Sequence, residues 1–154
     1  MMLANGLKSF VPPATPVRLS PYITWAANVH PNRKELAAIT NALVVFDQEF
    51  DQYAKSHRFM GASIVIAGNP EIGIILDEPD VMGHTAQLII LPVYLWREKN
   101  LSIPVMIVCV LEELCHHFYA EEDEIKVQHL VTACARHLWP NVQVENLYHA
   151  DWQS

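Results

Sequence analysis

The most constraining feature of the sequence is an apolar run, IPVMIVCVL (103–111), that leads directly into EELCHH (112–117). Proline is tolerated in the first turn of a helix, where its missing N–H is not needed, so Pro104 fits the start of a helix. We therefore predict a helix over residues 104–119. It is apolar on nearly every side before Glu112, which is typical of a helix at the centre of a fold. Charged side chains at its end need partners, because an unpaired buried charge is costly.

The preceding half of the chain predicts one helix and a small sheet. From Asn32 onward, apolar residues recur at helical spacing and predict a long amphipathic helix over residues 33–56. Three apolar, β-rich runs follow, separated by turn residues. They predict a three-stranded sheet made of SIVIAG (63–68), IGIILDE (72–78) and AQLIILPVYLW (86–96).

The two ends of the chain complete the expected organisation. Residues 1–31 are rich in proline and predict an irregular arm that wraps over the body. Residues 124–138 repeat apolar side chains at helical spacing until Pro140, which predicts a C-terminal helix. The order is thus a long helix, three strands, a buried helix and a final helix. This order defines the α+β class, and 154 residues suit one domain over 1–154.

Composition excludes some classes of function. The formal net charge is -7 and the 10 Lys and Arg residues are scattered, so we expect no nucleic-acid partner. The longest apolar run has nine residues, whereas a spanning helix needs about 20, so we expect no membrane insertion. The start of the chain lacks a secretory signal pattern, which favours a cytoplasmic location. Three cysteines lie in apolar segments and are predicted to be free thiols: Cys109, Cys115 and Cys134.

The spacing within EELCHH matches a known kind of metal site. Residues four apart share one face of a helix, so Glu112 and His116 project together, while Glu113 lies about 100° away. In the motif H-E-x-x-H, two such histidines hold zinc and the intervening glutamate takes a proton from the zinc-bound water. This chain has E-E-x-x-H, with Glu112 in the position of the first histidine.

With these residues the chain resembles the zincin metallopeptidases, particularly the ImmA/IrrE-type family. The active-site helix of that family reads like HELGHHF and is followed by a helix of pattern E-x-x-A-N-x-F-A. This sequence has EELCHHF (112–118) and then EIKVQHLV (124–131), and the resemblance spans roughly residues 32–138. It implies a zincin-like fold, metal-dependent peptidase activity, and a peptide or protein segment as the partner. The site residues that it implies are the metal ligands Glu112, His116 and Glu124 and the general base Glu113.

The glutamate in place of the first histidine changes the implied chemistry. A Glu/His/Glu ligand set is harder and more anionic than His/His/Glu, so the divalent metal could be zinc, manganese or iron. Two carboxylates also donate more charge to the metal, which weakens its acidification of bound water. The resemblance therefore leaves two functions open. One is a metal-dependent peptidase with an altered metal site that lays its substrate along residues 86–92. The other is a catalytically inactive zincin-like module that binds or regulates.

Several assignments remain open at this stage. Glu122 and Asp123 compete with Glu124 for the third ligand position, and a turn at residues 121–123 favours Glu124. His129 is a weaker candidate, and His117 is expected to be a hydrogen-bonding neighbour of the site.

The same residues also permit other interpretations. EELCHH and the acidic residues 121–124 could form a solvated helix end and an exposed loop. The E-x-x-H spacing also occurs in di-iron sites, which need a second copy that the chain lacks. His84, just before the third predicted strand, could contact substrate or be an ordinary loop residue.

Overall fold

The computed structural model describes residues 2–4, 10–50, 61–71, 73–75, 80, 82 and 87–148. It belongs to the α+β class, as predicted. Five strands are described: β1 (Met2–Ala4), β2 (Ile23–Ala27), β3 (Ala62–Ile66), β4 (Gly73–Ile75) and β5 (Leu88–Leu91). The described helices are α1 (Arg33–Phe50), α2 (Val93–Glu98), α3 (Ile103–Phe118), α4 (Glu124–Ala135) and α5 (Val144–Leu147), with a short 3-10 turn at Ser20–Tyr22.

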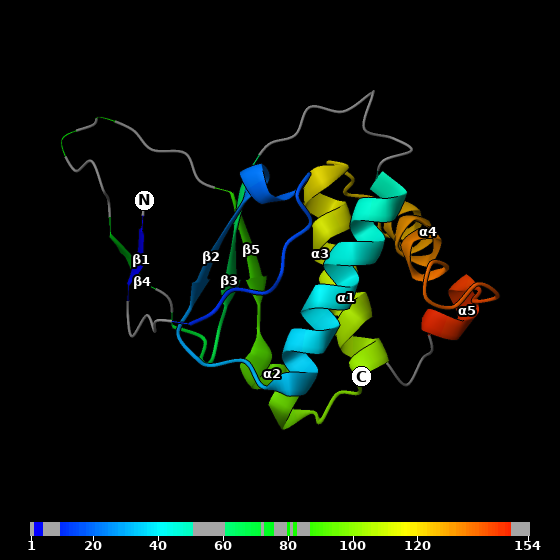
Figure 1. The fold of residues 1–154 in the computed structure, drawn as a ribbon, viewed down its shortest axis with the longest axis horizontal. Helices are drawn as coiled ribbons and strands as arrows, with labels where there is room; N and C mark the ends of the chain where they lie inside the picture. The colour runs from blue at the N-terminus through cyan, green and yellow to red at the C-terminus, as the bar shows by residue number, and fades with distance from the viewer. Residues whose placement is uncertain are drawn as a thin grey trace.

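The main sheet consists of three parallel strands in the order β2-β3-β5. Ile23 pairs with Ala62 across β2 and β3, and Ser63 pairs with Leu88 across β3 and β5. Helix α1 makes the crossover from β2 to β3, which is the usual way to join neighbouring parallel strands. Figure 1 shows α1 and α3 packed side by side on one face of this sheet. Strands β1 and β4 form a separate antiparallel pair.

The predicted three-stranded sheet exists, but its strands differ from the prediction. Strand β2 lies in the proline-rich segment predicted to be an irregular arm. Its first and last residues, Ile23 and Ala27, bury their side chains in the core, and this burial stabilises a strand there. The strand predicted over residues 72–78 is described only at Gly73–Ile75, and it pairs with β1 instead of entering the main sheet. The strand predicted over residues 86–96 ends before Pro92, and α2 begins directly after it.

Helix α1 confirms the predicted long helix over residues 33–50, and residues 51–56 of that prediction lie outside the described residues. A reciprocal pair of hydrogen bonds fixes its start. The Glu35 backbone N–H donates to the Asn32 side-chain oxygen (2.9 Å), and the Asn32 N–H donates to the Glu35 carboxylate (2.8 Å). This capping box satisfies two backbone donors that a helix otherwise leaves without partners.

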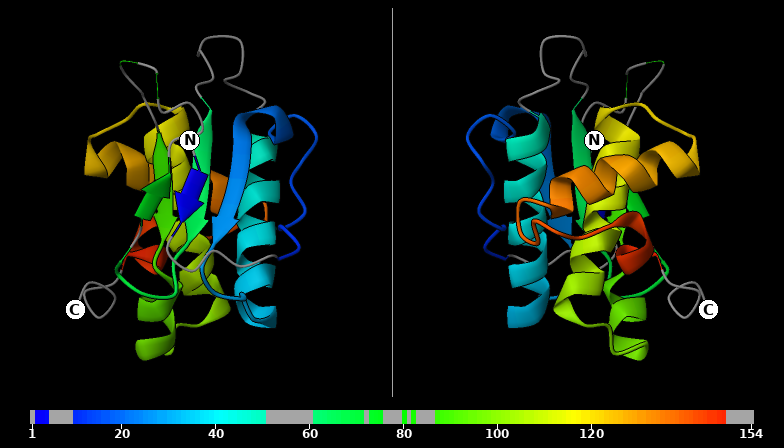
Figure 2. Two further views of the ribbon diagram at one scale, coloured as in Figure 1. Left: turned by 90° about the vertical axis from the view of Figure 1, so that its left-hand side faces the viewer. Right: turned by 90° about the vertical axis from the view of Figure 1, so that its right-hand side faces the viewer.

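Helix α3 is the buried central helix that the sequence predicts, and it begins one residue earlier, at Ile103. It packs against α1, α4 and β5. Figure 2 shows α4 crossing α1 and α3 on the side away from the sheet. Eight side chains of α3 are buried: Met106, Ile107, Val108, Val110, Leu111, Leu114, Cys115 and Phe118.

Helix α4 confirms the predicted final helix, but it ends at Ala135, three residues before Leu138, the last apolar position of the predicted repeat. The Asp123 carboxylate caps its first turn by accepting the backbone N–H groups of Ile125 (2.9 Å) and Lys126 (3.1 Å). Ala120, with φ of 51°, lies in the left-handed region and separates α3 from α4. The turn predicted between these helices is therefore present.

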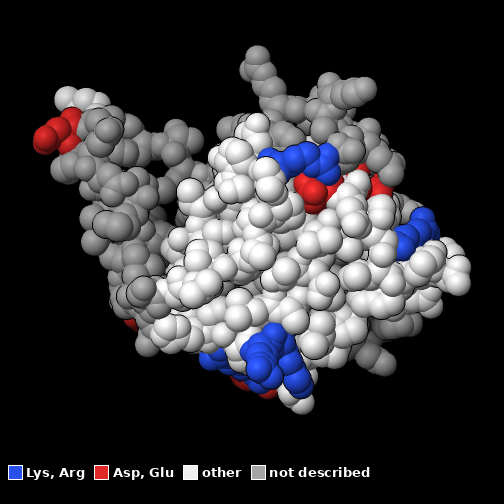
Figure 3. Space-filling model, viewed as in Figure 1, with Lys and Arg blue, Asp and Glu red and all other residues white. Residues whose placement is uncertain are grey.

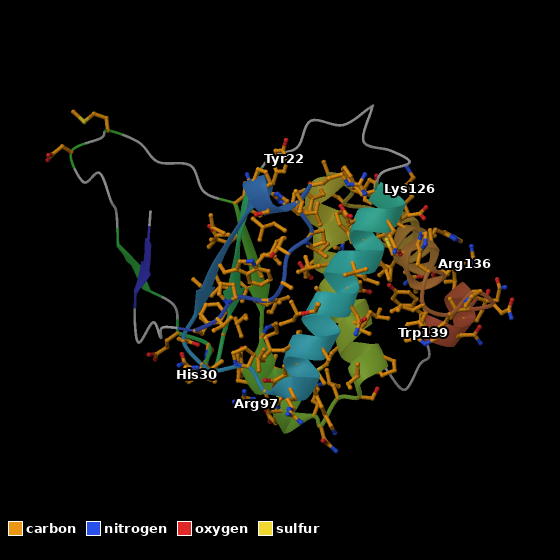
Figure 4. The ribbon with its side chains drawn as sticks, viewed as in Figure 1. Tyr22, His30, Arg97, Lys126, Arg136 and Trp139 are labelled. Atoms are coloured by element: carbon orange, nitrogen blue, oxygen red, sulfur yellow. The ribbon has the colours of Figure 1, made fainter. Side chains whose placement is uncertain are left out.

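An ion pair between a buried carboxylate and an exposed guanidinium joins α1 to α2. Glu35 is only 2% exposed, and its carboxylate accepts two hydrogen bonds from the Arg97 guanidinium at 2.8 and 2.9 Å. Arg97 also donates to the backbone carbonyl of His30 (2.9 Å), and Figure 4 shows Arg97 and His30 at the same end of the molecule. One guanidinium thus fixes the chain before α1, the first turn of α1 and helix α2.

Surface charge and helix length are two further general features of the structure. Figure 3 shows a mainly uncharged face over α1, with its basic side chains in small separate groups. Within the described ranges, none of the helices combines the length and the apolar character that crossing a lipid bilayer requires.

We expect Arg97→Ala to lower the free energy of unfolding by about 2–3 kcal/mol, because it leaves the buried Glu35 carboxylate without its charged partner. Urea denaturation followed by circular dichroism would measure this change. Arg18→Ala is the matched control, since Arg18 contacts Asp47 at 3.1 Å with its side chain half exposed. An exposed pair of that kind contributes about 0–1 kcal/mol. Equal effects of the two substitutions would contradict the structural role of the pair between Arg97 and Glu35.

Candidate functional site

The charged end of α3 lies beside β5, and two adjoining hollows separate them. The first has a volume of about 420 Å³ and extends from the start of β5 to the last turn of α3. The second, also about 420 Å³, follows β5 toward Pro92 and Trp96. Leu88 and Glu113 line both hollows, which we together call the β5 groove. Its walls are therefore one strand edge and one face of α3.

Strand β5 presents backbone groups to this groove. The Ser63 N–H donates to the Gln87 carbonyl and the Ala67 N–H to the Leu91 carbonyl, both at 2.9 Å, so the backbone groups of residues 87, 89 and 91 face β3. Alternate residues in a strand direct their N–H and C=O groups to opposite sides, so those of Leu88 and Ile90 point away from β3. In the described part of the chain, no strand pairs with this outer edge.

His116 is held at the end of α3 in a defined orientation. Its Nδ1 lies 2.7 Å from the Glu121 backbone carbonyl, and its Nε2 lies 3.5 Å from the Glu124 carboxylate. When Nδ1 carries the proton, it donates a hydrogen bond to the Glu121 carbonyl, and Nε2 is directed at Glu124. Metal-ligating histidines commonly make this type of backbone hydrogen bond. The structure thus brings two of the predicted ligands, His116 and Glu124, into contact.

Glu112 faces a different partner, Tyr148. Burial raises the pKa of Glu112 above its usual value, and the negative charges of Glu113 and Glu124 raise it further. The neighbouring Tyr148 phenol and the proximity of His116 oppose this rise. The pKa of Tyr148 is raised in turn, first by burial and then by the Glu112 charge. Tyr148 follows α5, in a tail that periodicity leaves unclassified, so the sequence carries no signal for this contact.

Glu113 projects into the groove itself. The Glu113 side chain is exposed, but the groove walls remove part of its solvent and so raise its pKa; His116 lowers this pKa and the charge of Glu124 adds to the rise. Glu113 thus lies where a bound molecule would meet it, next to an imidazole that favours its charged form.

The predicted metal-ligand set is only partly assembled. Within the described residues, no three His, Cys, Asp or Glu side chains stand close enough together to hold a metal ion. His116 and Glu124 meet, but Glu112 does not complete a set with them. The residues as arranged therefore do not fit a three-ligand centre, and we derive no reaction step through a metal.

The other candidate residues have separate roles in the structure. Asp123 caps α4, Glu122 lines the groove, and His117 packs edge-on against Phe118 with 4.7 Å between ring centroids. His129 is exposed on α4, and His84 lies outside the described residues.

The cysteines are free thiols, as predicted. Burial raises the pKa of Cys109 to about 11 and that of Cys115 well above its usual value, so both remain protonated near neutral pH. A protonated thiol is a poor nucleophile. Thiol chemistry at these two positions is therefore disfavoured.

Comparison of the chain with protein-family models, with curated proteins and with solved structures gave no match. A functional interpretation therefore depends on the β5 groove and on the side chains that α3 and α4 place beside it.

We expect Glu112→Gln to stabilise the protein relative to wild type more at about pH 7 than at about pH 4. The pKa of Glu112 is raised in the folded state above its usual value of 4.5, so folding favours its neutral form. The stability that this group contributes is present below the unfolded pKa and is lost as pH rises through the folded pKa. Glutamine is neutral at both pH values.

Urea denaturation of wild type and variant at both pH values measures this difference. Glu98→Gln, which removes an exposed carboxylate at the end of α2, controls for the loss of one negative charge. A stability change for Glu112→Gln that is the same at both pH values would contradict the effect of burial on Glu112.

Proposed function

We propose that this protein is a zincin-like module that binds an extended peptide or protein segment in the β5 groove. The outer edge of β5 carries this proposal, because the backbone N–H and C=O groups of Leu88 and Ile90 point away from β3. An extended segment can add to such an edge through main-chain hydrogen bonds. The groove beside the edge gives its side chains a place to bind.

The two sides of an added strand would meet different surfaces. Successive side chains of a strand point to opposite faces, so alternate residues of the bound segment would face α3. These residues would meet Glu113 and His116. The remaining residues would lie next to Leu88 and Ile90, which are 36% and 42% exposed. The backbone would then supply affinity and the residues facing α3 would supply selectivity.

Binding without hydrolysis is favoured over catalysis by the position of Glu112. A zincin-type reaction needs a complete set of metal ligands, and the described residues contain no such group of three. Glu112, in the position of the first ligand, instead interacts with Tyr148. The interaction with Tyr148 gives this carboxyl a structural partner and so accounts for its presence without a metal.

Metal-dependent peptide hydrolysis is the second candidate function. It is supported by the contact between His116 and Glu124, by the backbone carbonyl that orients His116, and by the position of Glu113 beside them. The carboxylates would suit manganese or iron as well as zinc. Glu113 would be the group that accepts a proton in this function.

We expect Ile90→Pro to weaken binding of an extended peptide at least about tenfold, because proline removes the outward N–H and blocks strand addition. Proline is compatible with an edge strand, since the Ile90 N–H is not used in the ladder with β3. Ile90→Val is the matched control, because it keeps the N–H and a β-branched side chain. Fluorescence anisotropy with labelled peptides would measure affinity. Equal affinities of the two variants would exclude strand addition at β5.

Calorimetric titration with zinc separates the two candidate functions. If Glu112 occupies a ligand position, Glu112→His should raise zinc affinity, because a neutral imidazole suits zinc better than a second carboxylate. Adding Glu113→Gln to that variant should leave zinc affinity unchanged, since Glu113 would move protons and not bind the ion. Equal, negligible zinc binding by wild type and Glu112→His would exclude zinc-dependent hydrolysis at these residues.

A further inference from the structure

The side chains that can carry a full charge in the β5 groove are acidic, apart from its histidines. Glu112, Glu113 and Glu122 line it, and no lysine or arginine does so among the residues that the structure describes. Lys126, on the neighbouring helix, extends to Glu121 at 4.0 Å. The other titratable groups that line the groove are His116, His117 and Cys109. Among the described residues that line it, the basic neighbours of Glu113 are therefore imidazoles.

The apolar lining of the groove adds a second property. Trp96, Pro92 and Leu91 line one hollow beside Glu112 and Glu113, and Ile89 and Phe118 line the other. Apolar walls that end at carboxylates match a side chain with a long aliphatic stem and a cationic head. Lysine and arginine are built in this way, and they commonly bury their stems while the charged head meets a polar partner.

We infer that the segment bound in the β5 groove carries a lysine or arginine side chain at the position that faces Glu113. This inference depends on the proposed function, because it assigns the kind of segment that the same groove selects. The aliphatic stem packs between β5 and α3, and the ammonium or guanidinium group pairs with the carboxylates of Glu113 and Glu112. A segment with a glutamate or aspartate at that position is rejected by like-charge repulsion.

Three labelled peptides test the inference. They are blocked at both ends, alternate valine and threonine, and differ only at a central residue, which is lysine, glutamine or glutamate. We expect wild type to bind the lysine peptide about fivefold more tightly than the glutamine peptide, the range of an exposed ion pair. The glutamate peptide should bind most weakly. The preference for lysine should largely disappear at about 1 M salt, where the Debye length is about 3 Å.

Two variants connect this preference to the groove. Glu113→Gln should bring the affinities for the lysine and glutamine peptides within about twofold of each other. Glu98→Gln, which removes an exposed carboxylate from α2, should leave the lysine preference intact. A preference that survives Glu113→Gln would overturn the assignment to this residue.

The outcomes distinguish the inference from the function on which it depends. If all three peptides bind equally and Ile90→Pro weakens each of them, strand addition is correct and the cationic selectivity is wrong. If none of the peptides binds, both are wrong. Selective binding of the lysine peptide that is lost in Ile90→Pro and reduced in Glu113→Gln would establish both.

Discussion

The burial of α3 is the constraint on which the rest of the structure depends. Each fully buried Leu, Ile or Val side chain contributes about 1.5–3 kcal/mol of apolar transfer free energy. The eight buried side chains of α3 therefore fix both its position and its rotation between the sheet, α1 and α4. With that rotation set, the carboxylates and imidazoles at its end emerge beside β5 and the start of α4. The groove is thus a direct result of how the apolar part of the same helix packs.

The chemistry of the groove follows from like charges placed close together. Glu112 is partly buried and Glu113 is exposed at the groove surface, and loss of solvent together with neighbouring negative charge raises the pKa of each. A divalent metal and a cationic side chain are two ways to compensate the same negative charge. The ligand geometry disfavours the metal, since Glu112 interacts with Tyr148. The apolar walls and the outer edge of β5 favour a segment of polypeptide that brings its own cation.

Each end of α1 holds a buried glutamate that has a side-chain partner. At its start, Glu35 is buried with a fixed bidentate partner in Arg97 and a backbone donor from Asn32. Toward its end, Glu49 contacts His137 of the segment after α4 at 2.8 Å. Such satisfied pairs hold elements together and leave no charge to bind a ligand. Among the described residues, no hydrogen bond or ion pair of fixed geometry holds Glu113 in this way, which makes it the better candidate for recognition.

The sequence by itself determined the helices α1, α3 and α4, because their signals are local. Helical spacing, the Asn32–Glu35 capping box and the Asp123 cap lie within a few residues of one another. Only the tertiary structure decided which strands pair, since β2 and β3 are joined through contacts about 40 residues apart and β2 is hidden in a proline-rich segment. It also decided the site, because the partner of Glu112 is Tyr148, brought from the end of the chain by packing that no local pattern encodes.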